Sequence, residues 1–488
     1  MSYTNANNKD EPAKPTTGNP YTISEWDKLY FDMYTPVFAI YKYQEKDNPN
    51  TYSQQKIITT FQKGLKKATK QLPPISAKLN LNNLKRPMTN TSPTNPTFKV
   101  RTFLPGEYKS YDELAERSFL TDDFDISLLV PEEVLVNINN SENNDERCIC
   151  FIQLNFIPGG IIFTIGGNHM ATDITSIDMM ALLICECTKA CLENRSPNHH
   201  EYNFDRRLFI PPTNTAEEFD PDPANMPIIF DKTNIPPPIA LNMKPPAAGS
   251  MKGQMYRITT FNAKKLKELC KPMTIDNGVT VEYISTYDCF IAMLFKSIAR
   301  VRTTINPSLL QENKEWWIYT AYNLRPRKQI PQNYFGNGIN VVPKVPISIT
   351  DILGHDGCSF IASSSRRSIL NNQGLLICQR AVAAAANANM HMHIDQLQKA
   401  AVLVPTGFPE TSLLVSDWCS IDVANWDFGI GSPSALRSFS LPTPNTTFLF
   451  PDCSSKHETR AYLYVCLTEL ELDLLNMDVE FRRWFELL

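Results

Sequence analysis

The most informative segment of the chain is residues 161–173, which read IIFTIGGNHMATD. An apolar run ends in two glycines, a histidine follows almost at once, and an aspartate stands four residues after the histidine. The pattern predicts a buried strand, a tight loop and the start of a helix. Such a loop holds its histidine on rigid elements at an edge that a substrate can reach, so His169 is the first candidate for a catalytic residue.

The spacing His-x-x-x-Asp is weak evidence by itself. A second copy stands at His391 and Asp395, after an alanine-rich stretch and without a preceding strand or glycine pair. A single histidine is also more often structural than catalytic. The strand and the two glycines favour the copy at His169 as the functional one.

Length and composition place the chain among globular proteins. At 488 residues it exceeds one ordinary hydrophobic core, so two domains are expected. An apolar content of 42% and a charged content of 20% are typical of soluble proteins. The net charge of -4 implies no strongly basic surface, so nucleic acid is not an expected partner.

Targeting, membrane and metal signals are missing from the sequence. Residues 1–20 are polar and predict a disordered tail rather than a signal peptide. No apolar run reaches the roughly 18 residues that predict a membrane span. None of the twelve cysteines stands in a Cys-x-x-Cys pair, so we expect no metal site and reduced, buried cysteines in the cytoplasm.

Strand and helix patterns alternate through both halves, which predicts the α/β class with mixed sheets. The expected elements include helices over 53–71, 176–194 and 285–302, strands over 147–156, 161–165 and 255–261, and a helix from Glu469 to the C-terminus. Residues 195–250 are proline-rich and hold few regular patterns. We therefore expect an N-terminal domain over 21–205, a crossover linker over 206–253 and a C-terminal domain over 254–488.

The residue types of the 161–173 segment permit proton transfer. A neutral histidine can act as a general base near neutral pH. Asp173 could cap the following helix or pair with an arginine to fix the loop. The chain has no Gly-x-Ser-x-Gly elbow for an acyl-serine and no glycine-rich nucleotide loop. What remains is attack by a substrate hydroxyl or amine whose proton His169 removes.

The segment around His169 resembles the His-x-x-x-Asp motif of the BAHD acyltransferase family, and other segments match the family in order and spacing from about Tyr21 to the C-terminus. These segments are Tyr322-Asn323-Leu324-Arg325, Tyr334-Phe335-Gly336-Asn337, Trp418, and Asp427-Phe428-Gly429-Ile430-Gly431, which is similar to the family's Asp-Phe-Gly-Trp-Gly motif. The isoleucine form of that last motif is similar to the fungal branch, which includes trichothecene 3-O-acetyltransferases.

The resemblance implies two chloramphenicol-acetyltransferase-like domains with a channel between them. Acyl-CoA, with acetyl-CoA expected, would be a co-substrate rather than a bound cofactor, and a small secondary metabolite would be the acceptor. His169 would deprotonate the acceptor, and Trp418 is the candidate donor to the oxyanion. Asp173 would orient the histidine loop through Arg325. Asp427 is a second catalytic candidate, although with Gly429 and Gly431 it is more typical of an architectural turn.

Three positions depart from the family pattern. Ile430 replaces a tryptophan, Asn323 stands where aspartate is common, and Asp417 precedes Trp418 where the family has serine. The residues that hold coenzyme A are unknown from the sequence. Two basic groups are candidates for its phosphates, although each is more often a solvated helix face: Lys264, Lys265 and Lys267, and Arg366 and Arg367.

Two other functions stay open. A peptide-synthetase condensation domain is disfavoured because Asn168 and Ile174 stand where that relative has histidine and glycine. A non-catalytic binding protein of the same fold is disfavoured by the intact His169 and Asp173. A monomer is expected, because one chain supplies both walls of the channel. The acceptor, the acyl length and the choice between O- and N-acylation are not determined by the sequence.

Overall fold

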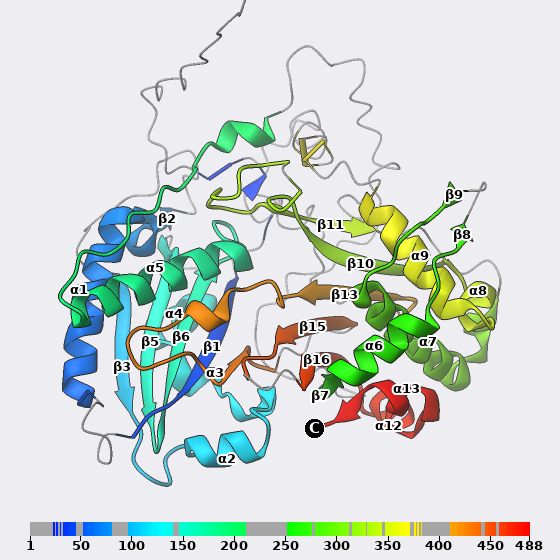
Figure 1. The fold of residues 1–488 in the computed structure, drawn as a ribbon, viewed down its shortest axis with the longest axis horizontal. Coiled ribbons are helices and arrows are strands. Elements are labelled where there is room, and N and C mark those ends of the chain that lie inside the picture. The colour runs from blue at the N-terminus through cyan, green and yellow to red at the C-terminus, as the bar shows by residue number, and fades with distance from the viewer. Residues whose placement is uncertain are drawn as a thin grey trace, which may run out of the picture.

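A computed structural model describes most of the chain, and two β-sheets dominate it (Figure 1). The described residues are 23–24, 26–27, 30, 33–44, 52–80, 96–139, 146–210, 251–275, 279–311, 315–327, 329–343, 347–370, 375–376, 378–379, 382, 410–440, 445–454 and 458–488. Among the described helices, none is both long and apolar enough to cross a membrane. The mixed α/β class expected from the sequence is confirmed.

The first sheet belongs mainly to the N-terminal half. Its strand order is β14 (Ala435–Arg437), β1 (Tyr34–Lys42), β6 (Gly160–Asn168), β5 (Cys150–Ile157) and β3 (Thr97–Thr102). Strands β1, β5 and β6 are antiparallel neighbours, and β3 runs parallel to β5. Alternate residues of β1 serve opposite faces: Val37 and Ala39 join one hydrophobic cluster, whereas Phe38 and Ile40 join another.

Helices cover both faces of this sheet. The long helices α1 (Gln54–Gln71) and α5 (Ile174–Leu192) pack on one face, as the 3.6-residue spacing of their apolar residues predicts. Shorter helices cover the other face: α2 (Tyr111–Glu116), α3 (Ile126–Leu129) and α4 (Glu132–Asn139). A two-stranded pairing of β2 (Lys78–Asn80) with β4 (Glu146–Cys148) lies beside the sheet.

The second sheet belongs to the C-terminal half. Its path is β11 (Ile339–Pro343), β10 (Glu315–Asn323), β13 (Ser412–Asp417), β15 (Thr446–Pro451), β16 (Thr459–Thr468), β7 (Met251–Thr259) and β17 (Glu486–Leu487), with β12 (Ile347–Ser348) beside β10. Strand β13 runs parallel to both neighbours, and the other pairs are antiparallel. This sheet is therefore mixed as well.

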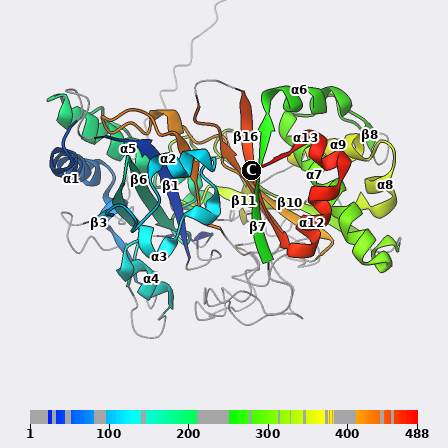
Figure 2. The ribbon, with the colours of Figure 1, turned by 90° about the horizontal axis from the view of Figure 1, so that it is seen from below.

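The helices of the second half pack on one side of this sheet around the buried α7 (Thr286–Ile305). They are α6 (Thr260–Leu269), α8 (Ile349–Leu353), α9 (Gly357–Leu370), α12 (Glu469–Met477) and α13 (Val479–Trp484), with the small pair β8 (Thr274–Ile275) and β9 (Val279–Thr280) nearby. Seen from below, α1 lies at one end of the molecule and α8 at the other, with both sheets between them (Figure 2).

One segment of the second half crosses back to the first sheet. After β13 the chain passes through Trp426 and Phe428, whose rings pack against Phe163 of β6, and it then forms β14 beside β1. Figure 1 shows this segment in orange, running from β13 toward the first sheet. A boundary at residue 254 therefore does not separate the two sheets. A three-residue strand carries too little alternation to be predicted from sequence.

Several expected boundaries can be compared with the described residues. The predicted linker over 206–253 overlaps a 3₁₀ turn at Arg206–Phe209 and the first residues of β7, and 211–250 lie outside the described residues. The strand expected over 255–261 is wrong at both ends, because β7 begins at Met251 and Thr259 caps α6 by accepting the N–H of Asn262. The tail expected over 1–20 also lies outside the described residues.

The single helix expected from Glu469 to the C-terminus is also wrong. Helix α12 ends at Met477, and Asp478 caps a new helix by accepting the N–H of Phe481. The last residues then form β17 at the edge of the sheet beside β7. The aspartate cap and the free sheet edge override the helical pattern.

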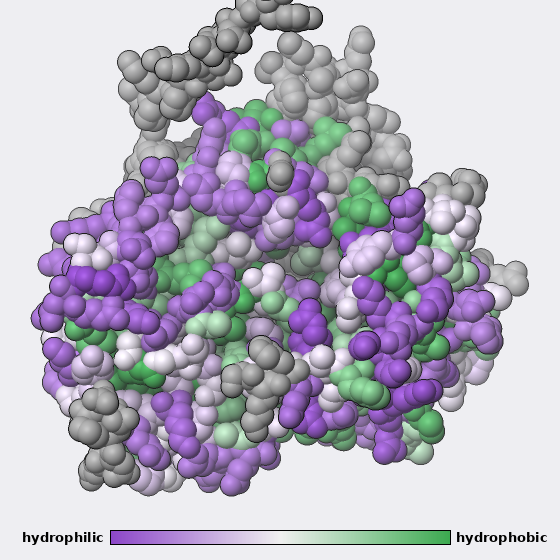
Figure 3. All heavy atoms as spheres, in the orientation of Figure 1, coloured by the Kyte–Doolittle hydropathy of each residue, from purple (hydrophilic) through white to green (hydrophobic). Residues whose placement is uncertain are grey.

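The surface of the described residues is mostly hydrophilic on the face shown in Figure 3, and hydrophobic residues reach it in scattered patches. The most exposed large hydrophobic residues are Val479, 82% exposed, and Met477, 72% exposed, on neighbouring short helices. Scattered apolar residues of this kind are normal on a soluble surface and indicate no partner by themselves.

Candidate active site

The loop between β6 and α5 is closed by its own backbone. The carbonyl of Asn168 accepts the N–H groups of Ala171 and Thr172 at 2.9 and 3.0 Å, and the Thr172 hydroxyl at 2.9 Å. A side chain at Gly167 would place its Cβ 2.2 Å from the Thr172 hydroxyl oxygen. The glycine before the loop is therefore needed for the turn that presents His169.

His169 lies at the contact between the first sheet and segments from elsewhere in the chain. Its N–H donates to the carbonyl of Met33, just before β1, at 2.7 Å, and its carbonyl accepts the side-chain amide of Asn337 at 2.8 Å. Its imidazole stacks on the ring of Tyr30, with 4.9 Å between centroids and 15° between planes. Backbone and ring are thus held by two other parts of the chain, the segment before β1 and the β10–β11 connection.

The surroundings of His169 favour its neutral form. Burial of the imidazole lowers the pKa of His169 below the ordinary value of 6.5, while the nearby carboxylate of Asp173 acts in the opposite direction. A histidine with a lowered pKa is unprotonated at neutral pH. It can therefore accept a proton from a substrate without first losing one.

Asp173 both caps α5 and pairs with an arginine, so the two expectations for it hold together. One carboxylate oxygen accepts the N–H of Ser176 at 2.8 Å, which caps the helix. The other accepts Nη1 of Arg325 at 2.7 Å and the N–H of Gly338 at 2.8 Å. Both side chains of this ion pair are buried, so the pair fixes the start of α5 rather than meeting solvent.

Arg325 extends this contact to the connection between β10 and β11. Its Nη2 donates to the carbonyl of Gly336 at 2.8 Å, and its Nε donates to the carbonyl of Tyr334 at 2.9 Å. The Ser176 hydroxyl completes the junction by exchanging hydrogen bonds with the backbone of Gly336. The segments at 322–325 and 334–337 are therefore brought together at the N-terminus of α5.

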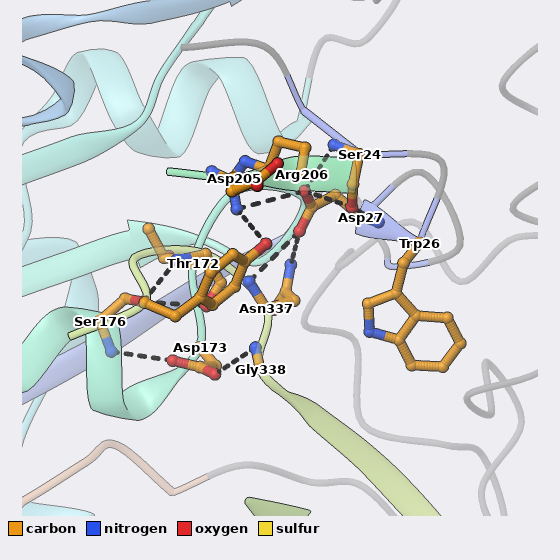
Figure 4. Close-up of polar contacts among 12 residues, drawn as sticks. Ser24, Trp26, Asp27, Thr172, Asp173, Ser176, Asp205, Arg206, Asn337 and Gly338 are labelled. Carbon is orange, nitrogen blue, oxygen red and sulfur yellow. Dashed lines mark hydrogen bonds and ion pairs between the residues drawn. The ribbon is translucent and has the colours of Figure 1, made fainter. Parts of the chain in front are cut away.

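A second buried ion pair lies beside the first, and the sequence did not single it out (Figure 4). The carboxylate of Asp27 accepts the N–H and hydroxyl of Ser24 at 2.7 Å each and lies 3.6 Å from Nη1 of Arg206. The same guanidinium donates to the Tyr334 hydroxyl at 2.6 Å. A serine three residues before an aspartate was the available signal, because that spacing suits a local side-chain to backbone bond.

The turn around Asp427 is held by different partners. Its carboxylate accepts Nζ of Lys189 at 2.7 Å and the N–H groups of Gly429 and Gly431 at 2.8 and 2.9 Å. Partial burial opposes ionisation, but these donors outweigh it, so the pKa of Asp427 lies below its usual value. Both glycines have positive φ, 104° and 98°, which other residues rarely adopt.

Asp427 lies far along α5 from the histidine loop. Its partner Lys189 stands fifteen residues after the first residue of α5, which at 1.5 Å per residue is about 22 Å from the start of the helix. The donors around Asp427 also occupy both of its oxygens. This placement argues against the catalytic role considered for Asp427 and favours the architectural one.

Trp418 lies in an aromatic cluster at the end of β13. Its ring meets Phe448 and Phe450 edge-on, and its indole N–H donates to the hydroxyl of Ser416 at 3.0 Å. A role as oxyanion donor would require that hydrogen bond to be exchanged, so the role stays a prediction. The departure at Asp417 does not remove a serine contact to Trp418, since Ser416 provides one.

The basic groups considered for the phosphates of coenzyme A lie on α6 and α9. The charges of Lys267 and Arg366 lie 4.9 and 5.3 Å from the ring centroid of Tyr283. Arg366 also donates to the buried carboxylate of Asp288 at 2.8 Å, which neutralises much of its charge. A phosphate role for either group stays a prediction.

Two remaining expectations concern metals and the second histidine motif. Within the described residues, no group of three or more histidine, cysteine or acidic side chains is arranged to hold a metal ion. The second His-x-x-x-Asp pattern, at 391–395, lies outside the described residues. The choice between the two copies therefore rests on the geometry found around His169.

Comparisons with known proteins agree with this arrangement. The model of the transferase family matches residues 7–482. A trichothecene 3-O-acetyltransferase of Fusarium sporotrichioides is 24% identical over 93% of this chain and 93% of its own length, and one of Saccharomyces cerevisiae is 22% identical over 93% and 92%.

The fold has a solved counterpart. The crystal structure of F. graminearum TRI101 complexed with coenzyme A and T-2 mycotoxin superposes with a TM-score of 0.73 at 19% identity, over 95% of this chain and 98% of that one. This likeness shows the fold, and the family model covers nearly the whole chain. The chain belongs to the transferase family, as an acyltransferase of the BAHD type.

Proposed function

We propose that the protein transfers an acetyl group from acetyl-CoA to a hydroxyl group of a small secondary metabolite, with His169 as the general base. The observation that supports this function best is a half-buried histidine, with a pKa lowered by burial, on a loop fixed to both halves of the chain. The similarity to trichothecene 3-O-acetyltransferases supports acetyl as the acyl group and oxygen as the acceptor atom.

The reaction runs as a direct transfer. The imidazole of His169 takes the proton of the acceptor hydroxyl, and the oxygen attacks the thioester carbonyl. The tetrahedral intermediate then collapses, the carbon–sulfur bond breaks, and the imidazolium returns its proton to the leaving thiolate. Proton transfer by such a positioned base contributes roughly 10²–10⁴-fold in rate. Trp418 is the proposed donor to the oxyanion, after release of its bond to Ser416.

The Asp173–Arg325 pair and the Asp427 turn take supporting roles in this proposal. Asp173 and Arg325 hold the start of α5, so they keep the histidine loop in register with the β10–β11 connection. Asp427, Gly429 and Gly431 form the turn by which the second half returns to the first sheet. We therefore assign them to positioning and architecture, not to contact with substrate.

We also propose a domain organisation, an oligomeric state and a cellular compartment for the protein. The two sheets with their helices represent two domains, and a channel between them would admit acyl-CoA and acceptor from opposite sides. A single chain provides both domains, which favours a monomer. Free cysteines at all twelve positions are consistent with a reducing compartment such as the cytoplasm.

Thiol release from acetyl-CoA with a panel of alcohols and amines tests the function, with product masses measured in parallel. We expect acceptor-dependent release with alcohols, and a product heavier by one acetyl group. The matched control is His355→Ala, because His355 is almost fully exposed beside a helix start. A protein that binds a metabolite and transfers no acyl group from any donor would instead be a binding protein of the same fold.

A further inference from the structure

The segment before β1 places an aromatic ring against the imidazole of His169. Tyr30 is buried and stacks on the imidazole at 4.9 Å between centroids, nearly parallel. Its hydroxyl donates to the carbonyl of Ile339 at 2.7 Å, and the indole N–H of Trp26 donates to the same carbonyl at 3.2 Å. The tyrosine is therefore tied at its far end to the start of β11 and cannot swing away without losing that bond.

The same segment also reaches the backbone of His169 through one intermediate residue. The side-chain amide of Asn337 donates to Oδ1 of Asp27 at 3.0 Å and to the carbonyl of His169 at 2.8 Å. The N–H of Asn337 donates to Asp27 as well, at 3.2 Å. Asp27 thus fixes the rotamer of Asn337, whose side-chain amide holds the His169 carbonyl.

Asp27 is fully buried, and a buried carboxylate is retained at a cost unless donors satisfy it. Its donors come from three places: Ser24 in its own segment, Asn337 after β10, and Arg206 in the 3₁₀ turn that follows α5. The carboxylate of Asp27 therefore joins three segments of the chain, and one of its partners, Asn337, also holds the carbonyl of His169.

We propose that Tyr30 and Asp27 are positioning residues of the transferase, Tyr30 for the ring plane of His169 and Asp27, through Asn337, for its backbone. The proposal rests on the function proposed above, in which His169 is the general base. Neither residue touches substrate in it. Their effect is to keep the imidazole nitrogen aligned with the acceptor hydroxyl, where a displacement of about 1 Å can cost roughly 100-fold in rate.

The first test separates catalytic positioning from simple stability. We expect Tyr30→Leu to lower kcat about 10- to 100-fold with little change in either KM, and Tyr30→Phe, which keeps the stacking, to recover most of the rate. Tyr256→Leu is the matched control, since Tyr256 is an equally buried tyrosine in the C-terminal core. A loss in Tyr30→Leu that matches the control, or wild-type kcat in Tyr30→Leu, would overturn the role of Tyr30.

The second test uses the acid limb of the pH profile of kcat/KM, which reports protonation of the base. The charged groups that face His169 are Asp27 and Asp173, each paired with an arginine, Arg206 or Arg325. Removing the Tyr30 ring admits water, which raises the pKa of His169, so Tyr30→Leu moves the limb to higher pH. Asp27→Asn removes a negative charge, which lowers that pKa and moves the limb to lower pH.

Opposite shifts of the acid limb in the two variants are expected if Tyr30 and Asp27 position His169, and they are not expected from general destabilisation. Asp123→Asn is the control for Asp27→Asn, because Asp123 is another buried carboxylate with basic partners, Lys109 and Arg117. Shifts in the same direction, or an Asp27→Asn enzyme that keeps wild-type kcat, would overturn the proposal.

His169→Ala in the same experiment separates the two proposals. An inactive His169→Ala beside a fully active Tyr30→Leu refutes the positioning role of Tyr30 and leaves the general base intact. A fully active His169→Ala refutes both the general base and the positioning roles of Tyr30 and Asp27.

Discussion

Two motif loops lie at opposite ends of α5, one next to it in sequence and one brought there by the fold. Each loop combines glycine with an aspartate that pairs with a basic side chain. At the start of the helix, Asp173 and Arg325 are both buried, and the pair joins three segments around His169. At the far end, Asp427 and Lys189 are partly exposed, and the pair closes one turn.

The difference in burial between the two ion pairs indicates that the two motifs have different roles. A buried ion pair is costly to break and holds surrounding elements in one arrangement, which suits a loop that presents a base. A partly exposed pair contributes little energy, and the two glycines of the Asp427 turn have positive φ, which other residues rarely adopt. We therefore expect the catalytic base in the loop at the start of α5, and a structural role for the Asp427 turn at its far end.

The largest effect is expected from His169→Ala. The change removes the proposed base from the edge of the first sheet, so kcat should fall roughly 10²–10⁴-fold while the melting temperature changes little. Thiol release and thermal unfolding measure the two quantities, with His355→Ala as the control. A His169→Ala enzyme within threefold of wild type would remove the functional distinction between the two loops.

Arg325→Ala should damage both folding and activity. It leaves the buried carboxylate of Asp173 without its partner, which costs about 3–5 kcal/mol of stability at a buried site. The loop and the β10–β11 connection lose their link, so activity should fall in the fraction that folds. Denaturant unfolding and the specific activity of the monodisperse fraction are the measurements, and an unchanged midpoint would show that the pair is not structural.

Asp427→Asn should be a mild change in comparison. It weakens the bonds to Lys189 and to two backbone N–H groups, for a loss of about 1–2 kcal/mol, with kcat within a few-fold of wild type. Because the pKa of folded Asp427 lies below its unfolded value, this stability is present above about pH 4 and is lost as the pH falls through the folded pKa. Unfolding curves of both proteins at several pH values should therefore converge in acid.

The smallest effect is expected at Asp178, in the first turns of α5. Burial raises the pKa of Asp178 to about 6, although the indole N–H of Trp426 donates to it at 2.7 Å. The folded protein holds this proton more tightly than the unfolded chain, so Asp178 favours folding less as the pH rises from about 4 to about 6. Asp178→Asn should remove this dependence and raise the melting temperature slightly at pH 7, and a lower melting temperature there would contradict it.

The sequence predicted the parts of the site that depend on local pattern. The strand, turn and helix around His169 follow from the apolar run, the two glycines and the helical period, and Asp173 stands at a helix start where aspartate is a good cap. The link from Asp173 to Arg325 came from the family resemblance. All of these lie in or beside regular elements whose residues alternate or repeat.

The parts that the sequence did not predict depend on contacts between distant segments. Tyr30 and Asp27 stand in a segment without a clear period, and only the folded chain brings them behind His169. Strand β14 is too short to show an alternating pattern. It pairs with β1 after a segment in which Trp426 and Phe428 pack against the first sheet. Local propensity carries no information on either.

The pH dependence of acetyl-CoA thiol release by wild type, His169→Ala and Asp427→Asn tests the central claim most directly. We expect wild type and Asp427→Asn to share one acid limb with a midpoint below about 6.5, because burial lowers the pKa of His169. His169→Ala should lose both the rate and the limb. The account would be contradicted if His169→Ala kept the wild-type rate and acid limb. It would also be contradicted if the acid limb were lost in Asp427→Asn alone, because His169 would then not be the general base.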